Sequence, residues 1–195
     1  VEVMENLAAG AFVFQLNASD ADRDDSGRIV YSIPSSAALE VFSVDEESGE
    51  VVTRRPLDRE LRRLYELPVM ASDAGGKTGH ATLKVRVGDA NDNRPRFLLA
   101  AYRANIHANY SVGQPFLRVQ AVDADLDDNS RIVYSIYESN GTTRASDVFD
   151  INPTSGDLFL KQSSLTLANE VFQFFVRAED SGLPSLGNEV PVDVL

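Results

Sequence analysis

The chain has 195 residues, of which 43% are hydrophobic, and this is enough for one large domain or two small ones with packed cores. Its formal net charge of −12 argues against nucleic acid and against anionic membrane surfaces as partners. It contains no cysteine, so disulfides say nothing about its compartment, and it has no apolar run of about 18 residues that would predict a membrane span.

The two ends of the sequence resemble strands. The first residues, VEVMENLAAG, lack the charged start and the apolar core of a signal peptide. The last residues, VPVDVL, alternate up to the final position. We therefore expect the sequence to be a segment of a longer protein.

Short stretches of alternating apolar and polar residues occur along the whole chain. In chain order they are 12–16, 28–33, 81–87, 157–161, 171–178 and 189–194. They are rich in Val, Ile, Phe and Tyr and are separated by Gly, Asp, Asn and Ser, which is typical of β-strands. The one helix candidate, LDRELRRLYEL, is confined between Pro56 and Pro68.

The chain contains two copies of one pattern. The segment DADRDDSGRIVYSI at 20–33 returns as DADLDDNSRIVYSI at 123–136, and MASDAG at 70–75 returns as RAEDSG at 177–182. The copies therefore repeat every 105 residues or so, about the size of one small domain. About seven short strands in such a unit predict an all-β fold of two tandem seven-stranded Greek-key β-sandwiches with immunoglobulin-like topology.

The alternation also predicts which residues are buried. For the first repeat we expect a core of Phe12, Phe14, Leu16, Ile29, Tyr31, Ile33, Leu67, Val69, Leu83, Val85 and Val87. For the second we expect Phe116, Leu117, Ile132, Tyr134, Ile136, Phe149, Leu158, Leu160, Phe172, Phe174 and Val176.

An acidic connector, GDANDNRPRF at 88–97, lies between the repeats. Its side chains at 89, 91, 92 and 93 bring four oxygen-bearing groups within five residues, and the proline that follows prevents a helix. Asp, Asn and Pro are common turn residues, so the stretch alone fits a solvated turn. It also fits a cage for a hard cation, because Ca²⁺ binds six to eight oxygens from carboxylates, amides and main-chain carbonyls.

Five motifs together resemble extracellular cadherin repeats, and they cover the whole chain. They are MEN at 4–6, DAD at 20–22 and 123–125, LDRE at 57–60, A-x-D-x-G at 71–75 and 178–182, and D-x-N-D-N-x-P at 89–95. Each motif alone is short, but all five stand in the family's order with the observed period. The resemblance implies a first repeat at 1–88, a calcium-binding linker at 89–95 and a second repeat at 96–195, truncated before its own D-x-N-D-N linker.

In cadherins the calcium ions lie between consecutive repeats, and the resemblance implies about three Ca²⁺ at this linker. The ligands that it implies are Glu5, Asp58, Glu60, Asp89, the Ala90 carbonyl, Asn91, Asp92, the Asn93 carbonyl, Asp123, Asp125, the Asn129 carbonyl and Asp180. Eight of these carry carboxylates, so the cluster repels itself without cations. A like-charged pair at 4 Å costs about 4 kcal/mol at an effective dielectric constant of about 20.

The outer ends of the two repeats are expected to differ. The top of the first repeat offers Asp20, Asp22 and Asp73, which would form half of a site facing an absent upstream linker. In the second repeat HAN at 107–109 replaces x-E-N, and SLTL at 164–167 replaces LDRE. We therefore expect the next junction to bind little or no calcium and to bend.

The resemblance implies a function outside the cell. Asn17, Asn109 and Asn140 stand in N-glycosylation triplets. The chain has no tryptophan for strand swapping, which favours internal repeats of a long Fat-, Dachsous- or protocadherin-like ectodomain. We expect calcium-dependent cell–cell adhesion, with other cadherin ectodomains as homophilic or heterophilic partners, no nucleic acid and no small-molecule substrate. The alternative is a passive calcium-stiffened spacer or force-bearing segment without adhesive contact of its own.

Two other functions fit the acidic residues less well. As an enzyme the chain would have only His80 and His107 as imidazoles, and it has no nucleophile–base pair, phosphate-binding loop or HExxH segment. The segments DADRDD and DADLDD imitate the opening of an EF-hand loop. However, their sixth position is Asp where Gly is needed, and their twelfth is Tyr where Glu is needed.

Overall fold

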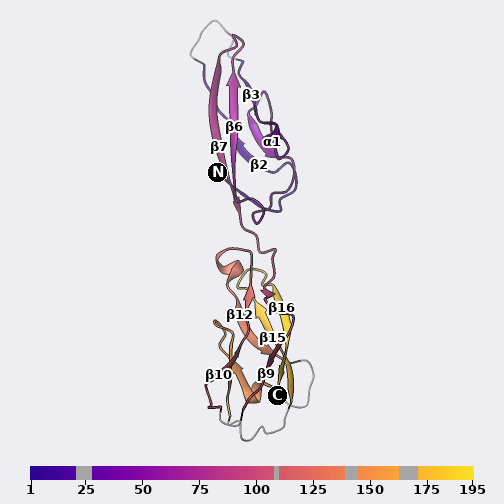
Figure 1. Cartoon of the computed structure of the whole chain (residues 1–195). Helices are drawn as coiled ribbons and strands as arrows, with labels where there is room; N and C mark the ends of the chain where they lie inside the picture. Colours follow the sequence, from indigo (N-terminus) through magenta and orange to yellow (C-terminus); the bar gives the residue numbers. More distant parts are fainter. Residues whose placement is uncertain (21–27, 108–109, 139–144, 163–170) are drawn as a thin grey trace. The chain divides into compact units, whose positions relative to one another are not determined.

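A computed structural model describes residues 1–20, 28–107, 110–138, 145–162 and 171–195 (Figure 1). Contacts divide the chain into two compact units, Val1–Ala90 and Asn91–Leu195. Each unit is a β-sandwich with its own core, so the prediction of two tandem all-β domains is confirmed. Within the described ranges no helix is long and apolar enough to cross a membrane.

The first unit packs a four-stranded sheet against a three-stranded one. The larger sheet has the order β1 (Glu2–Met4), β7 (Thr78–Gly88), β6 (Leu64–Ser72) and β3 (Val30–Ser32), and the smaller has the order β2 (Phe12–Gln15), β5 (Glu50–Thr53) and β4 (Phe42–Val44). Strand β1 runs parallel to β7, and β6 and β7 form a long antiparallel hairpin. A single helical turn, α1 (Ser36–Leu39), begins at Ser35, whose side chain accepts a hydrogen bond from the Ala38 N–H.

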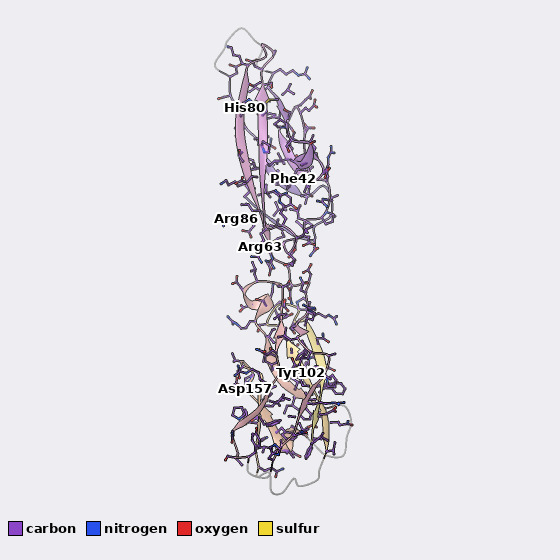
Figure 2. The ribbon with its side chains drawn as sticks, in the orientation of Figure 1. Phe42, Arg63, His80, Arg86, Tyr102 and Asp157 are labelled. Atoms are coloured by element: carbon purple, nitrogen blue, oxygen red, sulfur yellow. The ribbon has the colours of Figure 1, made fainter. Side chains whose placement is uncertain are left out.

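The predicted core of the first repeat is confirmed on β6 and β7. Alternate residues of β6 point inward, and Leu67 and Val69 are buried, as are Val85 and Val87 on β7. Between the sheets the ring of Phe42, which is labelled in Figure 2, meets the Tyr65 ring edge to face, with 5.2 Å between centroids. Phe42 and Tyr65 were not among the residues predicted for the core.

The prediction is wrong for β2. Phe12 and Phe14, predicted to be buried, are 59% and 38% exposed, whereas Val13 between them is 5% exposed. All three residues are apolar, so the alternation did not decide which face is inside. A bulge between Phe12 and Phe14 shifts the pairing with β5, and a shift of one residue exchanges the faces of a strand.

The second unit repeats this architecture. Its four-stranded sheet has the order β12 (Val133–Tyr137), β15 (Phe172–Glu179), β16 (Gly187–Val194) and β9 (Tyr102–Ala104), with β9 parallel to β16. The three-stranded sheet has the order β10 (Pro115–Arg118), β14 (Asp157–Leu160) and β13 (Phe149–Ile151). Two short strands, β8 (Arg96–Phe97) and β11 (Ala121–Val122), form a separate antiparallel pair. Single turns are α2 (Ala145–Val148) and the 3₁₀ turn η1 (Asp127–Ser130).

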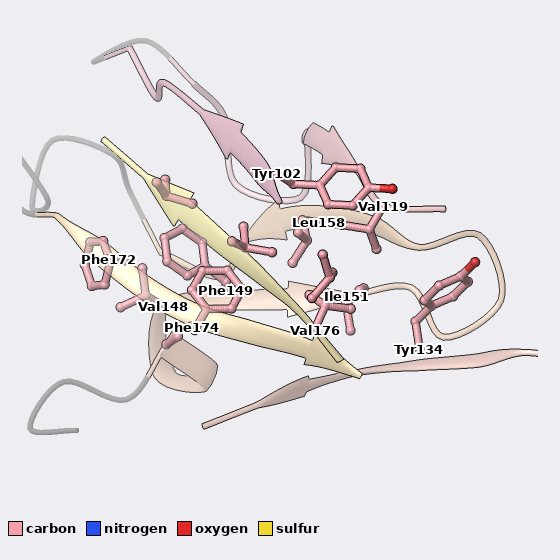
Figure 3. Packing of buried hydrophobic residues seen from close by; sticks show 14 of the residues in the cluster. Tyr102, Val119, Tyr134, Val148, Phe149, Ile151, Leu158, Phe172, Phe174 and Val176 are labelled. Carbon is pink, nitrogen blue, oxygen red and sulfur yellow. The ribbon is translucent and has the colours of Figure 1, made fainter. Parts of the chain in front are cut away.

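Aromatic rings fill one end of the second core (Figure 3). The Phe149 ring meets Phe172 edge to face at 5.0 Å and stacks on Phe174 at 5.4 Å between centroids. At the other end Tyr102 and Tyr134 carry their hydroxyls away from these rings (Figure 3), and the Tyr134 hydroxyl accepts a hydrogen bond from the Ala121 N–H. Buried tyrosines need such partners for the hydroxyl. The residues predicted for this core are buried or pack against it.

Candidate functional site

The end of the first unit where β7 leads into the linker is organised around Glu5, which is only 3% exposed. One carboxylate oxygen accepts a hydrogen bond from the Arg59 N–H at 2.7 Å, and the other accepts one from the Ala90 N–H at 2.8 Å. The Glu5 N–H donates to the Gly88 carbonyl at 3.0 Å. Glu5 therefore joins the end of β1 to two other segments, the turn after β5 and the end of β7.

Asn6 is the last residue of the MEN motif, and its conformation explains why asparagine stands there. Its φ of 61° lies in the left-handed region, which asparagine tolerates better than most residues. In this conformation the Asn6 N–H donates to the Leu57 carbonyl at 3.0 Å. The chain can then turn away from β1 and leave Glu5 against the LDRE segment.

The LDRE segment forms a turn with its acids and its arginine on different sides. Asp58 is exposed, and its Oδ1 accepts a hydrogen bond from the Leu61 N–H at 2.8 Å. Leu57 and Arg59 point inward and are 3% and 1% exposed. The Arg59 guanidinium forms ion pairs with Glu60 and with Asp89. Sequence reasoning had assigned no role to Arg59.

Three of the predicted ligands gather at this end. Carboxylate oxygens of Glu5, Glu60 and Asp89 all lie within 4.8 Å of one another. Calcium–oxygen distances are 2.3–2.6 Å, so two ligands of one ion stand at most about 5 Å apart. The spacing therefore fits a shared calcium ion. Asp58 lies on the same turn, with its carboxylate toward solvent.

The top of the second unit contains Asn91 beside a buried aspartate. The Asn91 side-chain amide donates to Asp180 Oδ1 at 3.1 Å and to the Pro184 carbonyl at 2.7 Å. Asp180 is 4% exposed and also accepts hydrogen bonds from the Gly182 and Leu186 N–H groups. The Asn91 Oδ1 is buried and accepts no hydrogen bond from the described residues. A buried acceptor without a donor is costly, and a cation would satisfy it.

Gly182, the last residue of the A-x-D-x-G motif, allows Asn91 to reach Asp180. A Cβ at this position would clash with Nδ2 of Asn91 and would lie 2.7 Å from Oδ1 of Asn129. Any residue other than glycine would therefore displace one of the two asparagines. The side chain of Asn129, for which only a carbonyl role was predicted, is thus part of the same packing.

Asp125 is positioned by Asn93. The Asn93 main-chain N–H donates to Asp125 Oδ2 at 3.1 Å, and its side-chain amide donates to Asp125 Oδ1 at 2.7 Å and to Asp92 Oδ1 at 2.7 Å. Asp123 accepts a hydrogen bond from the Asp125 N–H at 3.0 Å. The structure therefore brings Asp92, Asp123 and Asp125 together in this unit. The Asn93 side chain, for which only the carbonyl was predicted, contributes to this arrangement.

The remaining predicted residues are placed as follows. Asp20 and Asp73, at the top of the first unit, line one hollow of about 180 Å³ together with Lys77. The Asp73 carboxylate accepts a hydrogen bond from the Lys77 N–H at 2.7 Å. Asn17 is exposed. Asp22, Asn109, Asn140 and the replaced LDRE positions at 164–167 lie outside the described residues.

Both histidines lie on the surface. His80 on β7, labelled in Figure 2, is exposed and lies 3.2 Å from the Thr78 hydroxyl through its Nε2. His107 is exposed as well. Neither belongs to the groups of carboxylates described above.

Comparisons with known proteins agree with this architecture. A family model for the cadherin domain matches residues 1–88 and 102–195. The Fat-like cadherin-related tumor suppressor homolog of Drosophila melanogaster is 35% identical over 193 residues, which are 99% of this chain and 4% of that protein. Human Protocadherin Fat 1 is 35% identical over 196 residues, covering 100% of this chain and 4% of that protein. Drosophila melanogaster Protein dachsous is 37% identical over 185 residues, covering 93% of this chain and 5% of that protein.

Solved extracellular domains have the same fold. The extracellular domain of protocadherin gammaB4 matches with a TM-score of 0.87 at 26% identity, over 100% of this chain and 32% of that chain. Repeats EC22-24 of mouse cadherin-23 match with a TM-score of 0.83 at 25% identity, over 99% of this chain and 61% of that one. The chain spans only a small part of the curated relatives that it matches.

Proposed function

This chain belongs to the cadherin family, and from that premise we propose that it consists of two extracellular repeats joined by a calcium-binding linker at 89–95. Repeat 1 comprises 1–88 and repeat 2 comprises 96–195. The repeats are part of the ectodomain of a protein that is anchored in the plasma membrane elsewhere along its length. Their function is calcium-dependent cell–cell adhesion, with other cadherin ectodomains as homophilic or heterophilic partners.

The observation that supports this proposal most is the grouping of Glu5, Glu60 and Asp89, whose oxygens lie within 4.8 Å of one another. In the second unit the buried Asn91 Oδ1, beside Asp180, is a neutral oxygen of the kind that Ca²⁺ also takes. Both sets contain hard oxygen donors without nitrogen or sulfur, which favours calcium over zinc or copper.

About three calcium ions belong to this linker, with the ligands as the sequence predicts them. They are Glu5, Asp58, Glu60, Asp89, the Ala90 carbonyl, Asn91, Asp92, the Asn93 carbonyl, Asp123, Asp125, the Asn129 carbonyl and Asp180. Asp20, Asp22 and Asp73 form the half-site for an upstream linker. Bound calcium supplies the positive charge that lets these carboxylates stay close together.

The chain itself prepares each set of ligands before any ion binds. Main-chain N–H groups of Arg59 and Ala90 orient the Glu5 carboxylate. The amides of Asn91 and Asn93 do the same for Asp180 and Asp125. Preorganised groups lose less conformational entropy on binding. Extracellular calcium modules of this kind bind with dissociation constants of about 10⁻⁴–10⁻³ M.

Small-angle scattering of the whole chain, titrated with calcium and then with a chelator, tests the proposal. We expect the maximum dimension to sharpen as calcium rises, with a midpoint at or below about 1 mM. Glu60→Ala and Asp92→Ala should shift the midpoint upward by about tenfold or more, whereas the control Glu66→Ala removes an exposed acid of β6 and should not. Scattering that does not change with calcium would sink the proposal.

Bead aggregation separates adhesion from a passive role. Beads coated with the chain should aggregate in calcium, either with one another or with beads coated with other cadherin ectodomains, and should disperse in chelator. Stiffening without aggregation would reduce the function to the alternative, a calcium-stiffened spacer or force-bearing segment.

A further inference from the structure

We propose that Arg59 is a built-in cation of the first repeat and that Asp89, one of the proposed calcium ligands, is its counter-ion when no calcium is bound. The inference rests on the proposed function only in that Asp89 is taken from the ligand set given above. It concerns groups of one unit, Val1–Ala90.

The burial of Arg59 is unusual. Its side chain is 1% exposed, and it is the largest of the fully buried side chains in the described part of the chain. Arginine is almost never fully buried unless it is paired, because removing an unpaired charge from water is very costly. The fold therefore must supply a partner for this guanidinium.

Asp89 is the better enclosed of the two acids that meet Arg59. The Asp89 side chain is 13% exposed and pairs with the guanidinium Nε, whereas Glu60 is 25% exposed and pairs with the outer Nη2. The other acid of the same turn, Asp58, is exposed and accepts its hydrogen bond from the Leu61 N–H. Asp89 is thus the more enclosed partner of the arginine, and Glu60 and Asp58 are the more exposed acids.

The network also fixes the main chain. The Arg59 N–H and the Ala90 N–H donate to the two oxygens of Glu5. Arg59 itself and the neighbour of Asp89 are therefore hydrogen-bonded to the same carboxylate. Arg59 and Asp89 close this loop from the other side. We infer that the pair positions Glu5 and Glu60 whether or not calcium is bound.

The two roles of Asp89 predict opposite effects in the absence of calcium. If Asp89 were only a ligand, removing its charge would relieve repulsion with Glu5 and Glu60 and would stabilise the calcium-free repeat. If Asp89 is the counter-ion of a buried arginine, removing its charge leaves that arginine uncompensated and destabilises the repeat. The sign of the change therefore decides between them.

The experiment measures thermal unfolding and hydrogen–deuterium exchange of the full chain in EGTA. Asp89→Asn keeps the shape of the side chain and removes its charge, and Asp58→Asn is the matched control on the turn that contains Arg59. We expect Asp89→Asn to lower the transition temperature of the first repeat by about 10 °C or more, with faster exchange in peptides that contain Arg59 and Ala90. Asp58→Asn should leave both unchanged or raise the transition temperature slightly.

A double variant guards against a general loss of folding. Arg59→Met removes the buried charge, and Asp89→Asn in that background should cost much less than it does alone. Equal costs in both backgrounds, or a transition temperature for Asp89→Asn that matches Asp58→Asn, would overturn the proposal. If Arg59→Met does not fold, the comparison of the two Asp→Asn variants and their exchange rates still decides it. A wild-type chain that binds no calcium would defeat the proposed function while leaving this result intact.

Discussion

Replacing Gly182 with alanine is expected to break the packing of Asn91 at the top of the second unit. The added Cβ would clash with the Asn91 amide nitrogen and would come within 2.7 Å of Asn129 Oδ1. The Gly182 N–H donates to Asp180 Oδ1 at 3.0 Å, and this hydrogen bond holds the Gly182 main chain beside the buried carboxylate. The amide of Asn91 is the group nearest to the added Cβ, and we expect it to move.

The cost follows from the hydrogen bonds that Asn91 would lose. One is to the buried carboxylate of Asp180 and is worth about 1.5–3 kcal/mol, and the other, to the Pro184 carbonyl, is worth about 1 kcal/mol. We expect the free energy of unfolding of the second repeat to fall by about 2–4 kcal/mol. This is a large part of the 5–15 kcal/mol typical of a domain.

Urea unfolding in EGTA, monitored by hydrogen exchange in peptides from each repeat, measures this loss of stability. Gly79→Ala is the control, because a Cβ at Gly79 meets nothing within 4 Å, and alanine in a strand should be neutral or slightly stabilising. Asn91→Ala combined with Gly182→Ala should cost less than the sum of the two single changes. If Gly182→Ala unfolds like Gly79→Ala, the proposed clash is not what makes glycine necessary here.

Three further predictions concern the cores and the ends of the repeats. Phe149→Ala should lower the free energy of unfolding of the second repeat by about 3–5 kcal/mol in urea unfolding, because the Phe149 ring contacts three other phenylalanines. Phe12 is 59% exposed, so Phe12→Ala should change the free energy of unfolding of the first repeat by less than about 1 kcal/mol. Removal of calcium should make the linker at 89–95 the first site of cleavage in limited proteolysis, and preferential cleavage elsewhere would count against it. Asp73→Asn should leave the main calcium-binding step unchanged in calorimetry, since Asp73 is assigned to the proposed half-site, and a weakened main step would contradict that assignment.

Much of the fold was predictable because the chemistry of each motif is local. The repeat of DAD and of A-x-D-x-G predicted two similar domains, and alternation on β6 and β7 predicted their buried faces. The failure at Phe12 and Phe14 has an equally clear reason. An apolar run without polar neighbours has no preferred face, and the bulge that sets the register comes from pairing with β5.

The oxygen-rich motifs were visible in the sequence, because Asp, Asn and Glu at such spacing indicate a hard cation. The roles of the residues between them were not visible. Arg59 has a charge that usually lies at the surface, and only the fold places it under Glu60 and Asp89 at 1% exposure.

The repeat, the all-β class and the oxygen-rich residue types can be read from residue type and spacing along the chain. The partners of these residues depend on the fold: Glu5 meets two main-chain N–H groups, Asn91 meets Asp180, and Asp89 meets Arg59. These contacts join residues 30 to 89 positions apart, so they depend on the packing of two sheets rather than on the spacing of a motif.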